Sequence, residues 1–382
     1  MINNRVSVVV EGLFVALLRH ALWNVSSIEE TEGLTHKQFS QLLLLAKQQT
    51  VVGLISQTLI DYDIKLEEDD AMDVCSLLFS IKKQNRKIEE AVVNLCKMMD
   101  EQHIRILVMK GQTLSIFYPH PELRQSGDID FICHPDDIDR AVQFLKKDLG
   151  LELSDSGSDK HARFTIDDVK YEIHRMLTNF AYPSSHRYWE KVFMKEVWEH
   201  PYTVEINGFH VSTLEPTYNA VYIFEHILFH LIMDGVGLRQ FCDWALFLHQ
   251  HKDTIDKDLL VKHLEGVRLK KAYSGLGAVL TDYLGLPEES FPLPISEKDH
   301  QRVEPLFNNL IEWGNFGHNI LYKNSHGPLH GLEHIVRIGK QSIRFCHYAP
   351  TEILWRIPYM MKWWTKRIIR QFTPFCPSVF QK

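Results

Sequence analysis

Apolar residues recur at steps of three and four positions near both ends of the chain, a spacing typical of helices with one buried face. From about residue 5 to residue 100 this spacing is clearest in HKQFSQLLLLAKQQTVVGLISQTLI (36–60) and LLFSIKKQNRKIEEAVVNLCKMMDEQ (77–102). From about residue 215 it returns in PTYNAVYIFEHILFHLIM (216–233), GLRQFCDWALFLHQ (237–250), KDLLVKHLEG (257–266) and KKAYSGLGAVLTDYLG (270–285). The pattern predicts two helical regions on either side of a segment of different character.

Between residues 101 and 212 the apolar positions alternate instead, as they do in strands. HIRILVM (103–109) and GDIDFIC (127–133) read as strands, and HARFTIDDVKYEIHRML (161–177) reads as a hairpin that turns near Asp167 and Asp168. PDDIDRAVQFLKKDLG (135–150) reads as a helix, with acidic residues early and lysines late. We therefore expect an α+β fold, in which a small mixed sheet (101–212) lies between an N-terminal helical region (1–100) and a C-terminal helical region (213–382).

The composition narrows the class of protein. The net charge of −7 argues against a surface that wraps nucleic acid. The six cysteines are scattered without a CxxC spacing, which disfavours a zinc ribbon or a disulfide framework. The opening stretch MINNRVSVVVEGLFVALLRHALW resembles a signal peptide until Glu11 and Gly12 interrupt the apolar run, so we expect a buried helix there. No stretch is long and apolar enough to span a bilayer, and we expect a cytoplasmic protein.

The C-terminal residues depart from the overall charge. Residues 353–382 carry a charge of +6 and no acidic residue, which leaves −13 on the other 352 residues. In LWRIPYMMKWWTKRIIRQF (354–372) the cations alternate with Trp and Ile. This composition suits an anionic membrane surface or nucleic acid. It equally suits a closing helix docked on the acidic body of the protein, which is the interpretation that we favour.

Two aspartates in the predicted strand GDIDFIC point to metal chemistry. Asp128 and Asp130 project from the same face of the strand, where like charges repel unless a cation lies between them. Mg²⁺ is the natural partner, because it prefers carboxylate and phosphate oxygens. Glu172, on the second strand of the predicted hairpin, would complete a triad for two Mg²⁺ ions, with Mn²⁺ as a substitute. Asp167 and Asp168 are rival third carboxylates, but they fall at the expected turn.

The segment VMKGQTLS (108–115) places a glycine between a predicted strand and a predicted helix. Such a glycine lets backbone N–H groups approach a phosphate closely, and the start of the helix favours negative charge. The residues within reach of a phosphate there would be Lys110, Gly111, Gln112, Thr113 and Ser115.

The order of these motifs carries a family resemblance. A strand, a glycine turn, the strand GDIDF and a later acidic strand residue together resemble the polymerase-β-type nucleotidyltransferase superfamily. More narrowly, LVMKG, YPHPELR, GDIDFIC, YEIHRML and LRQFCDWALFL are similar to a bacterial group of uncharacterised nucleotidyltransferase family proteins. The similarity covers most of the chain and is most specific between residues 105 and 177.

The resemblance implies roles for particular residues. Asp128 and Asp130 would be the metal-binding pair, and Glu172 would be a third catalytic carboxylate that serves as a metal ligand or as a base toward the acceptor. Gly111 would be the glycine of the phosphate turn. Lys110 stands where the wider superfamily usually has another glycine. The narrower group shares this lysine, so the exact phosphate contacts stay open.

Three further residues belong to the narrower pattern. Arg124 could clamp a triphosphate or an acceptor, or it could simply pair with an acidic neighbour. Arg239 and Asp243 lie four positions apart on a predicted helix, where we expect an intrahelical pair that could support the site from beneath.

Several histidines could line a substrate pocket or bind a metal. His174 shares the strand face of Glu172, where it could contact substrate or be a structural residue. His226 and His230 have the i, i+4 spacing of zinc ligands, but EHILFH lacks the internal glutamate of a zinc-protease motif. We expect them in the core or in the substrate pocket. His330 and His334 form a weaker pair of the same kind.

These observations predict a metal-dependent nucleotidyltransferase, which would move a nucleoside monophosphate from an NTP such as ATP to an acceptor hydroxyl or phosphate and release pyrophosphate. A small molecule or a polysaccharide intermediate is the preferred acceptor, by family analogy alone, and nucleic acid is not favoured. A nucleotide-binding or regulatory protein that retains the fold without turnover is the alternative. A zinc-dependent hydrolase built on the histidine pairs is a third hypothesis.

Overall fold

The fold combines helices with a small mixed sheet, which confirms the predicted α+β class. The computed structural model describes residues 8–25, 33–155, 161–233, 235–315 and 339–372, with side chains as far as Met361 in the last range. The helices are α1 (Val8–Trp23), α2 (His36–Gln48), α3 (Val52–Asp61), α4 (Glu68–Glu101), α5 (Gln112–Ser115), α6 (Ile138–Gln143), α7 (Pro183–Tyr188), α8 (Met194–Glu199), α9 (Pro216–Met233), α10 (Leu238–Gln250), α11 (Lys257–Gly266), α12 (Lys270–Asp282), α13 (Glu297–His300), α14 (Val303–Trp313) and α17 (Pro350–Phe372). The strands are β1 (Ile106–Met109), β2 (Asp128–Cys133), β3 (Ser154–Asp155), β4 (His161–Ile166), β5 (Val169–His174), β6 (Tyr202–Ile206) and β7 (Phe209–Thr213).

The N-terminal region is helical, as the apolar spacing predicts. Helix α1 buries five apolar side chains, so the stretch that resembles a signal peptide is a packed helix in this fold. The apolar run 36–60 forms two helices rather than one, because the chain reverses at Thr50 (φ 55°) between α2 and α3. Thr35 begins α2 with a capping box, in which its side chain and that of Gln38 exchange hydrogen bonds with the backbone.

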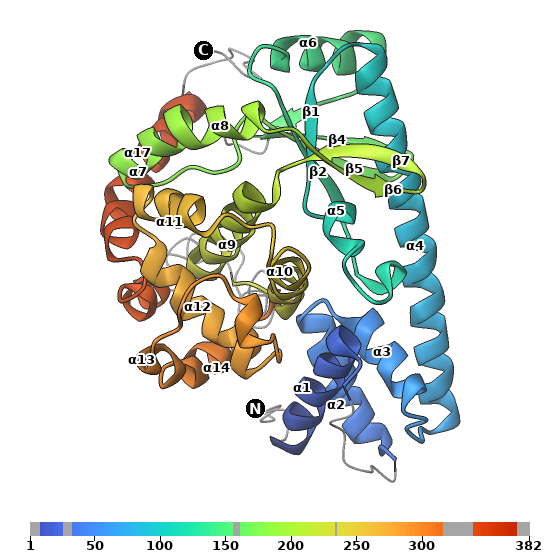
Figure 1. Ribbon diagram of the computed structural model, residues 1–382. Helices are drawn as coiled ribbons and strands as arrows, with labels where there is room; N and C mark the ends of the chain where they lie inside the picture. Colours follow the sequence, from blue (N-terminus) through green and yellow to red (C-terminus); the bar gives the residue numbers. More distant parts are fainter. Residues whose placement is uncertain (1–7, 26–32, 156–160, 234, 316–338, 373–382) are drawn as a thin grey trace.

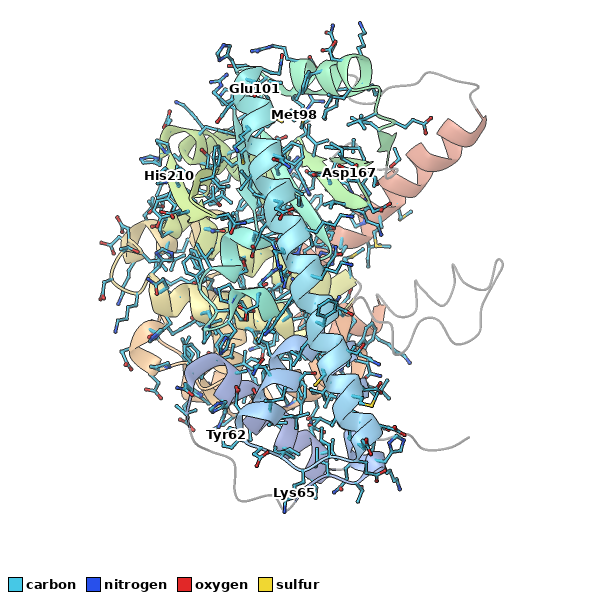
Figure 2. The ribbon with its side chains drawn as sticks, turned by 90° about the vertical axis from the view of Figure 1, so that its right-hand side faces the viewer. Tyr62, Lys65, Met98, Glu101, Asp167 and His210 are labelled. Carbon is cyan, nitrogen blue, oxygen red and sulfur yellow. The ribbon has the colours of Figure 1, made fainter. Side chains whose placement is uncertain are left out.

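Helix α4 is 34 residues long and connects the N-terminal helices to the sheet. It begins with three acidic residues in its first turn, where negative charge is favoured. Figure 1 shows α4 running the height of the molecule, and Figure 2 shows it passing in front of the sheet, from the level of Lys65 up to Glu101. The apolar stripe of α4 includes Ile88, Val92 and Leu95, which pack on the sheet.

The main sheet has five strands in the order β1-β2-β5-β4-β3. Strand β2 pairs antiparallel with β1 and parallel with β5, and β5 pairs antiparallel with β4. Because side chains alternate along a strand, each face of the sheet packs against a different apolar cluster. Ile129 and Phe131 of β2 lie in the apolar cluster that contains α4, whereas Ile132 lies in the cluster that contains α9 and α10. The face that carries Asp128 and Asp130 therefore looks toward the C-terminal helices.

The predicted hairpin is present, and its turn is where the sequence places it. Strands β4 and β5 pair from Ile166–Val169 outward. Asp167 and Asp168 between them both have positive φ (48° and 60°), as a tight two-residue turn requires. Asp168 is fully exposed. The two rival third carboxylates thus occupy the tip of the hairpin.

A second hairpin was missed in the sequence. Strands β6 and β7 pair around Asn207 and Gly208, which have φ values of 50° and 74°. Asn-Gly between alternating apolar residues is the strongest short-range hairpin signal. The stretch YTVEINGFHVST (202–213) has this pattern, so the hairpin could have been predicted from the sequence. This hairpin packs on α4 and the first sheet through Val204, Ile206 and Val211.

The C-terminal region is helical, and four of its helices match the four apolar segments of the sequence closely. Helices α9 to α12 pack against one another and, through α9 and α10, against the sheet. Helix α17 lies at the outer edge of this bundle (Figure 1). Among the helices of the described ranges, none combines the length and the apolar character needed to cross a bilayer.

Some sequence predictions fall on residues that the structure does not describe. They are the first seven residues of the opening apolar stretch, the pair His330 and His334, and the part of the basic tail beyond residue 372. The division at residues 100 and 212 stays a prediction.

Candidate active site

The three carboxylates singled out in the sequence lie on one face of the sheet. Strands β2 and β5 are parallel neighbours, and their register puts Asp130 directly beside Glu172. Asp128 is two residues before Asp130 on β2 and so projects from the same face. The negative charges of Asp130 and Glu172 both act on Asp128. The structure therefore brings these three residues together.

Asp130 is the most strongly neutralised of the three. Its Oδ2 atom lies 3.1 Å from Nζ of Lys110, and its Oδ1 atom lies 2.8 Å from Nε2 of His174. Burial alone would raise the pKa of Asp130, but Lys110 and His174 hold this pKa well below its usual value. Burial would likewise lower the pKa of Lys110, but Asp130 raises it above the ordinary value. The two groups form a charged pair that is largely shielded from water.

The backbone turn at Lys110 and Gly111 directs the side chain of Lys110 toward Asp130. Lys110 and Gly111 follow β1 and both have positive φ, at 53° and 48°, which is sparsely populated for a residue with a side chain. The ammonium group lies 5.8 Å from the ring centre of Tyr222 on α9. A strained residue of this kind is held in place by the contacts of its side chain, here those with Asp130 and Tyr222.

Among the described residues, Asp130 and Glu172 each form an ion pair with a cation, whereas Asp128 has no cation at ion-pair distance. Its side chain is reachable by solvent, yet protein atoms surround it closely. Desolvation, followed by the charge of Asp130, raises the pKa of Asp128 to about 6. The repulsion between these two residues that the sequence suggested is therefore only partly relieved by Lys110.

Glu172 has partners on β4 that the sequence analysis missed. Arg163 forms an ion pair with Oε1 of Glu172, and Nε2 of His161 lies 3.9 Å from Oε2. His174 Nε2 also approaches Oε2, at 3.6 Å. The signal was available, because a two-residue turn at 167–168 sets the register that places Arg163 opposite Glu172.

Helix α9 contributes histidines to the same region. Burial, followed by the nearby charge of Lys110, lowers the pKa of His226 well below its usual value. Asp130 and His174 also act on His226. The rings of His226 and His230 meet edge to face with centres 4.5 Å apart. His226 therefore lies near the carboxylates, as expected of a pocket residue.

Arg239, at the start of α10, is a partly buried cation near the carboxylates. Its Nη1 atom lies 3.8 Å from Oδ2 of Asp243, which is the intrahelical pair expected from the sequence. Burial and the positive charge of Arg124 lower the pKa of Arg239, whereas Asp243 and Asp128 oppose this change. Arg239 thus provides positive charge on the side of Asp128.

Arg124 has its own buried ion pair. It is 1% exposed and donates two hydrogen bonds to Asp243, from Nε to Oδ1 (2.7 Å) and from Nη2 to Oδ2 (2.8 Å). Tyr118 donates a third hydrogen bond to Oδ1 of Asp243, and Nη1 of Arg124 donates to Oγ of Ser126. Of the two alternatives considered for Arg124, the geometry favours pairing with an acidic neighbour. A direct contact with nucleotide stays a prediction and would require these bonds to be exchanged.

The other residues of the glycine turn are buried. Thr113 donates to the carbonyl oxygen of Lys110 (2.7 Å), and Ser115 donates to that of Gln112 (2.9 Å). The side-chain amide of Gln112 has no hydrogen-bond partner within the described part of the chain. Helix α5 is only four residues long, so its dipole is small. The structure does not bring these three side chains to the carboxylates, and their contacts with a nucleotide stay predictions.

The donor atoms present fit a divalent cation. One ligand atom from each of Asp130, Glu172 and His174 lies within 4.8 Å of the other two, and carboxylate oxygens with one imidazole nitrogen suit Mn²⁺ as well as Mg²⁺. The ammonium group of Lys110 already occupies a position that a cation would favour. Asp128, whose charge is poorly compensated, would gain from a bound cation.

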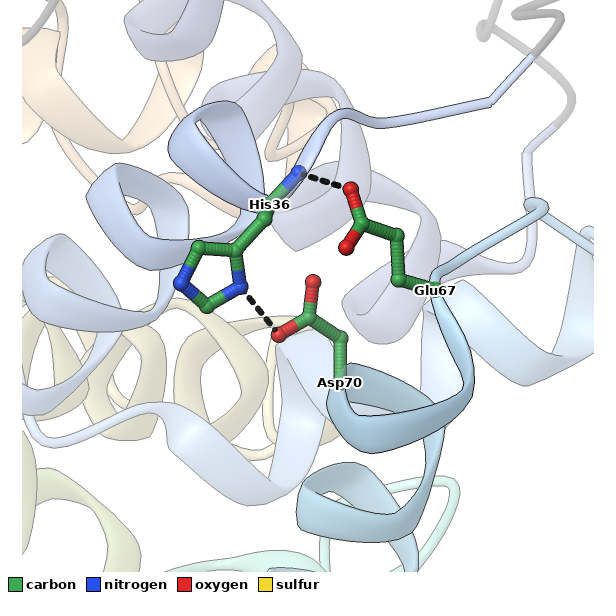
Figure 3. A group of neighbouring side chains, drawn as sticks. All are labelled: His36, Glu67 and Asp70. Atoms are coloured by element: carbon green, nitrogen blue, oxygen red, sulfur yellow. Dashed lines mark hydrogen bonds and ion pairs between the residues drawn. The ribbon is translucent and has the colours of Figure 1, made fainter.

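A second cluster outside this site meets the same distance criterion. Nδ1 of His36 lies 2.8 Å from Oδ1 of Asp70, and the backbone N–H of His36 donates to Oε1 of Glu67 (Figure 3). The cluster joins the first turns of α2 and α4. We interpret it as a contact between two helix starts, since an ion pair and a hydrogen bond account for the arrangement.

Comparisons with known proteins show what this chain is similar to. Residues 35–285 match the sequence model of a family described as uncharacterised nucleotidyltransferase. A crystal structure of an antigenic nucleotidyltransferase-like protein from Paracoccidioides brasiliensis is similar at 16% sequence identity, with a TM-score of 0.31, over 52% of this chain and 92% of that chain. No curated protein matches the sequence.

Proposed function

Because the chain belongs to the family of uncharacterised nucleotidyltransferases, we propose that it transfers a nucleoside monophosphate from an NTP to an acceptor hydroxyl or phosphate. In this reaction an acceptor oxygen forms a bond to the α-phosphorus while the bond from that phosphorus to the β-phosphate oxygen breaks, and pyrophosphate leaves. The observation that supports the proposal is that Asp128, Asp130 and Glu172 lie on one face of the neighbouring strands β2 and β5. Asp130 and Glu172 are direct neighbours across the two strands.

In this proposal Asp128, Asp130 and Glu172 would hold divalent cations, Mg²⁺ or Mn²⁺, with His174 beside them. When bound, the cations would offset the charge of the triphosphate and polarise the reacting phosphate oxygens. His174 contacts both Asp130 and Glu172, so its role would be to orient these carboxylates or to add a nitrogen ligand.

Lys110 would move between two partners. It pairs with Asp130 in the structure described here, and a cation that binds Asp130 would compete with it directly. The freed ammonium group would then be available to phosphate oxygens. Arg239 and His226, on the helices facing the carboxylates, would line the space for the nucleotide or the acceptor. A small molecule or a polysaccharide intermediate remains the preferred class of acceptor.

Titration calorimetry with α,β-methylene analogues of the four NTPs, which cannot release pyrophosphate, tests the nucleotide site. We expect binding of at least one analogue in the presence of Mg²⁺ or Mn²⁺ and much weaker binding without the metal. Glu172→Gln should reduce the metal-dependent binding at least tenfold, since one charged ligand is worth about 1.4 kcal/mol or more. Asp168→Asn is the matched control, because Asp168 lies on the same hairpin but at its exposed tip.

Equal binding by wild-type protein and Glu172→Gln would contradict the site assignment. A pyrophosphate-release assay with each natural NTP then separates the two classes of function. Release that depends on Asp130 supports transfer. Tight metal-dependent binding without release, in the presence of candidate hydroxyl acceptors, would support the nucleotide-binding alternative.

A further inference from the structure

Helix α17 exposes an apolar face to solvent. Leu354, Ile357 and Met361 are each 66% exposed, and Trp355 beside them is 44% exposed. The spacing of three and then four residues places the first three on one side of the helix. Of the thirteen large apolar side chains that are exposed among the described residues, four lie in this eight-residue stretch. Such a concentration marks a binding surface rather than scattered surface residues.

The opposite side of the helix attaches it to the body of the protein. Ile353 is buried, and Glu352 accepts hydrogen bonds from the backbone N–H groups of Ala181 (2.7 Å) and Tyr182 (3.1 Å). Arg356 donates to Glu352 over 3.0 Å and is itself buried. Because these contacts fix the start of α17, the described body of the chain packs against this side and leaves Leu354 and Ile357 exposed.

The charge of this segment indicates what kind of surface would cover the apolar face. After Glu352 the sequence of α17 contains Lys362, Lys366, Arg367 and Arg370 and no acidic residue. Each basic residue near an anionic lipid surface contributes about 1 kcal/mol of attraction. A nucleic acid would match the positive charge but would leave the apolar face uncovered, because its contacts are mainly with phosphates.

We propose that α17 lies in the surface of an anionic lipid membrane, with Leu354, Ile357 and Met361 turned toward the acyl chains. A long helix that combines an apolar face with several basic residues lies in the membrane plane rather than across the bilayer. The start of α17 docks on the body through Glu352 and Ile353, and its apolar side stays exposed for the membrane. Docking of the basic tail on the acidic body, which the sequence favoured, stays a prediction.

Vesicle flotation with the full chain tests the proposal, without nucleotide or metal, so that the result is independent of the proposed reaction. The vesicles contain either phosphatidylcholine alone or phosphatidylcholine mixed with phosphatidylglycerol. We expect the protein to float with the anionic vesicles, less so at high salt, and weakly with the neutral ones. Ile357→Ser and Leu354→Ser should each lower the partition coefficient about tenfold, because each removes one buried aliphatic side chain from the lipid.

Phe79→Ser is the matched control. Phe79 is 69% exposed on α4, outside α17, and this substitution should leave vesicle binding unchanged. All three substituted side chains are exposed, so circular dichroism and thermal unfolding should match the wild type. Absence of flotation with anionic vesicles would overturn the proposal, and so would equal loss in the Phe79→Ser variant. A wild-type dimer in size-exclusion chromatography that Ile357→Ser converts to monomer, without flotation of either protein, would assign the face to a second copy of the chain instead.

Discussion

The ammonium group of Lys110 lies 3.1 Å from Oδ2 of Asp130, in a region where both side chains are largely buried. Lys110 reaches this position through a left-handed backbone conformation at the end of β1. The pair compensates one of the clustered carboxylates and leaves Asp128, two residues away, with a raised pKa. Neighbouring aspartates on one strand thus have opposite electrostatic environments, and removing the charge of one or the other should have opposite effects.

Asp130→Asn should lower the free energy of unfolding by about 3 kcal/mol, because it leaves the buried Lys110 without its ion-pair partner. Asp128→Asn should raise this free energy by about 1 kcal/mol, because it removes an unfavourable charge that solvent screens in part. Urea unfolding at neutral pH without divalent cations measures both. Asp168→Asn, at the exposed hairpin tip, should change the value little. Equal destabilisation by both substitutions would mean that the two aspartates do not differ in this way.

The pH dependence of stability should carry the signature of Asp128. Its pKa is about 6 in the folded protein and 3.8 in an ordinary environment. Between these two values the folded state binds a proton that the unfolded state releases, so the contribution of Asp128 to stability increases as the pH falls from above 6 toward 4. The difference in unfolding free energy between Asp128→Asn and the wild type should therefore shrink over this interval. A difference that stays constant with pH would contradict the raised pKa.

Arg124 should behave as a structural partner of Asp243. Arg124→Met leaves a buried carboxylate without its two strongest hydrogen bonds, and we expect a loss of about 3 kcal/mol in the free energy of unfolding. Adding Asp243→Leu should recover part of this loss, since an apolar pair removes the unpaired charge. Urea unfolding of the single and double variants measures the coupling. Unchanged stability of Arg124→Met, with loss of nucleotide binding, would instead support the role of a triphosphate clamp.

The contact between His36 and Asp70 should stabilise the start of α2 and α4 in a pH-dependent manner. The hydrogen bond with Asp70 raises the pKa of His36 above 6.5. The stabilisation is therefore fully present below 6.5 and is lost as the pH rises through the higher pKa of the folded state. Thermal unfolding from about pH 6 to about pH 9 should show a decline for the wild type that His36→Gln reduces. His210→Gln, at an exposed position on β7, should keep the decline.

Local patterns in the sequence determined much of the candidate site. Alternation along GDIDFIC places Asp128 and Asp130 on one face, and the Asp167-Asp168 turn sets the register of Arg163 and Glu172. Both follow from the period of a strand and from turn geometry, which involve few residues. The apolar spacing likewise predicted α9 to α12, because a helix with one buried face repeats at short range.

The tertiary structure alone decided which distant residues meet. The parallel pairing of β2 with β5 places Asp130 beside Glu172, 42 residues later in the chain. Arg124 meets Asp243 across 119 residues, and Lys110, which follows β1, meets Asp130 of β2. These contacts form because two separate apolar clusters pack on the two faces of the same sheet. Which face is buried against which helices is a property of the whole packed chain, because many weak apolar contacts are satisfied together, whereas a sequence pattern records only the spacing within each element.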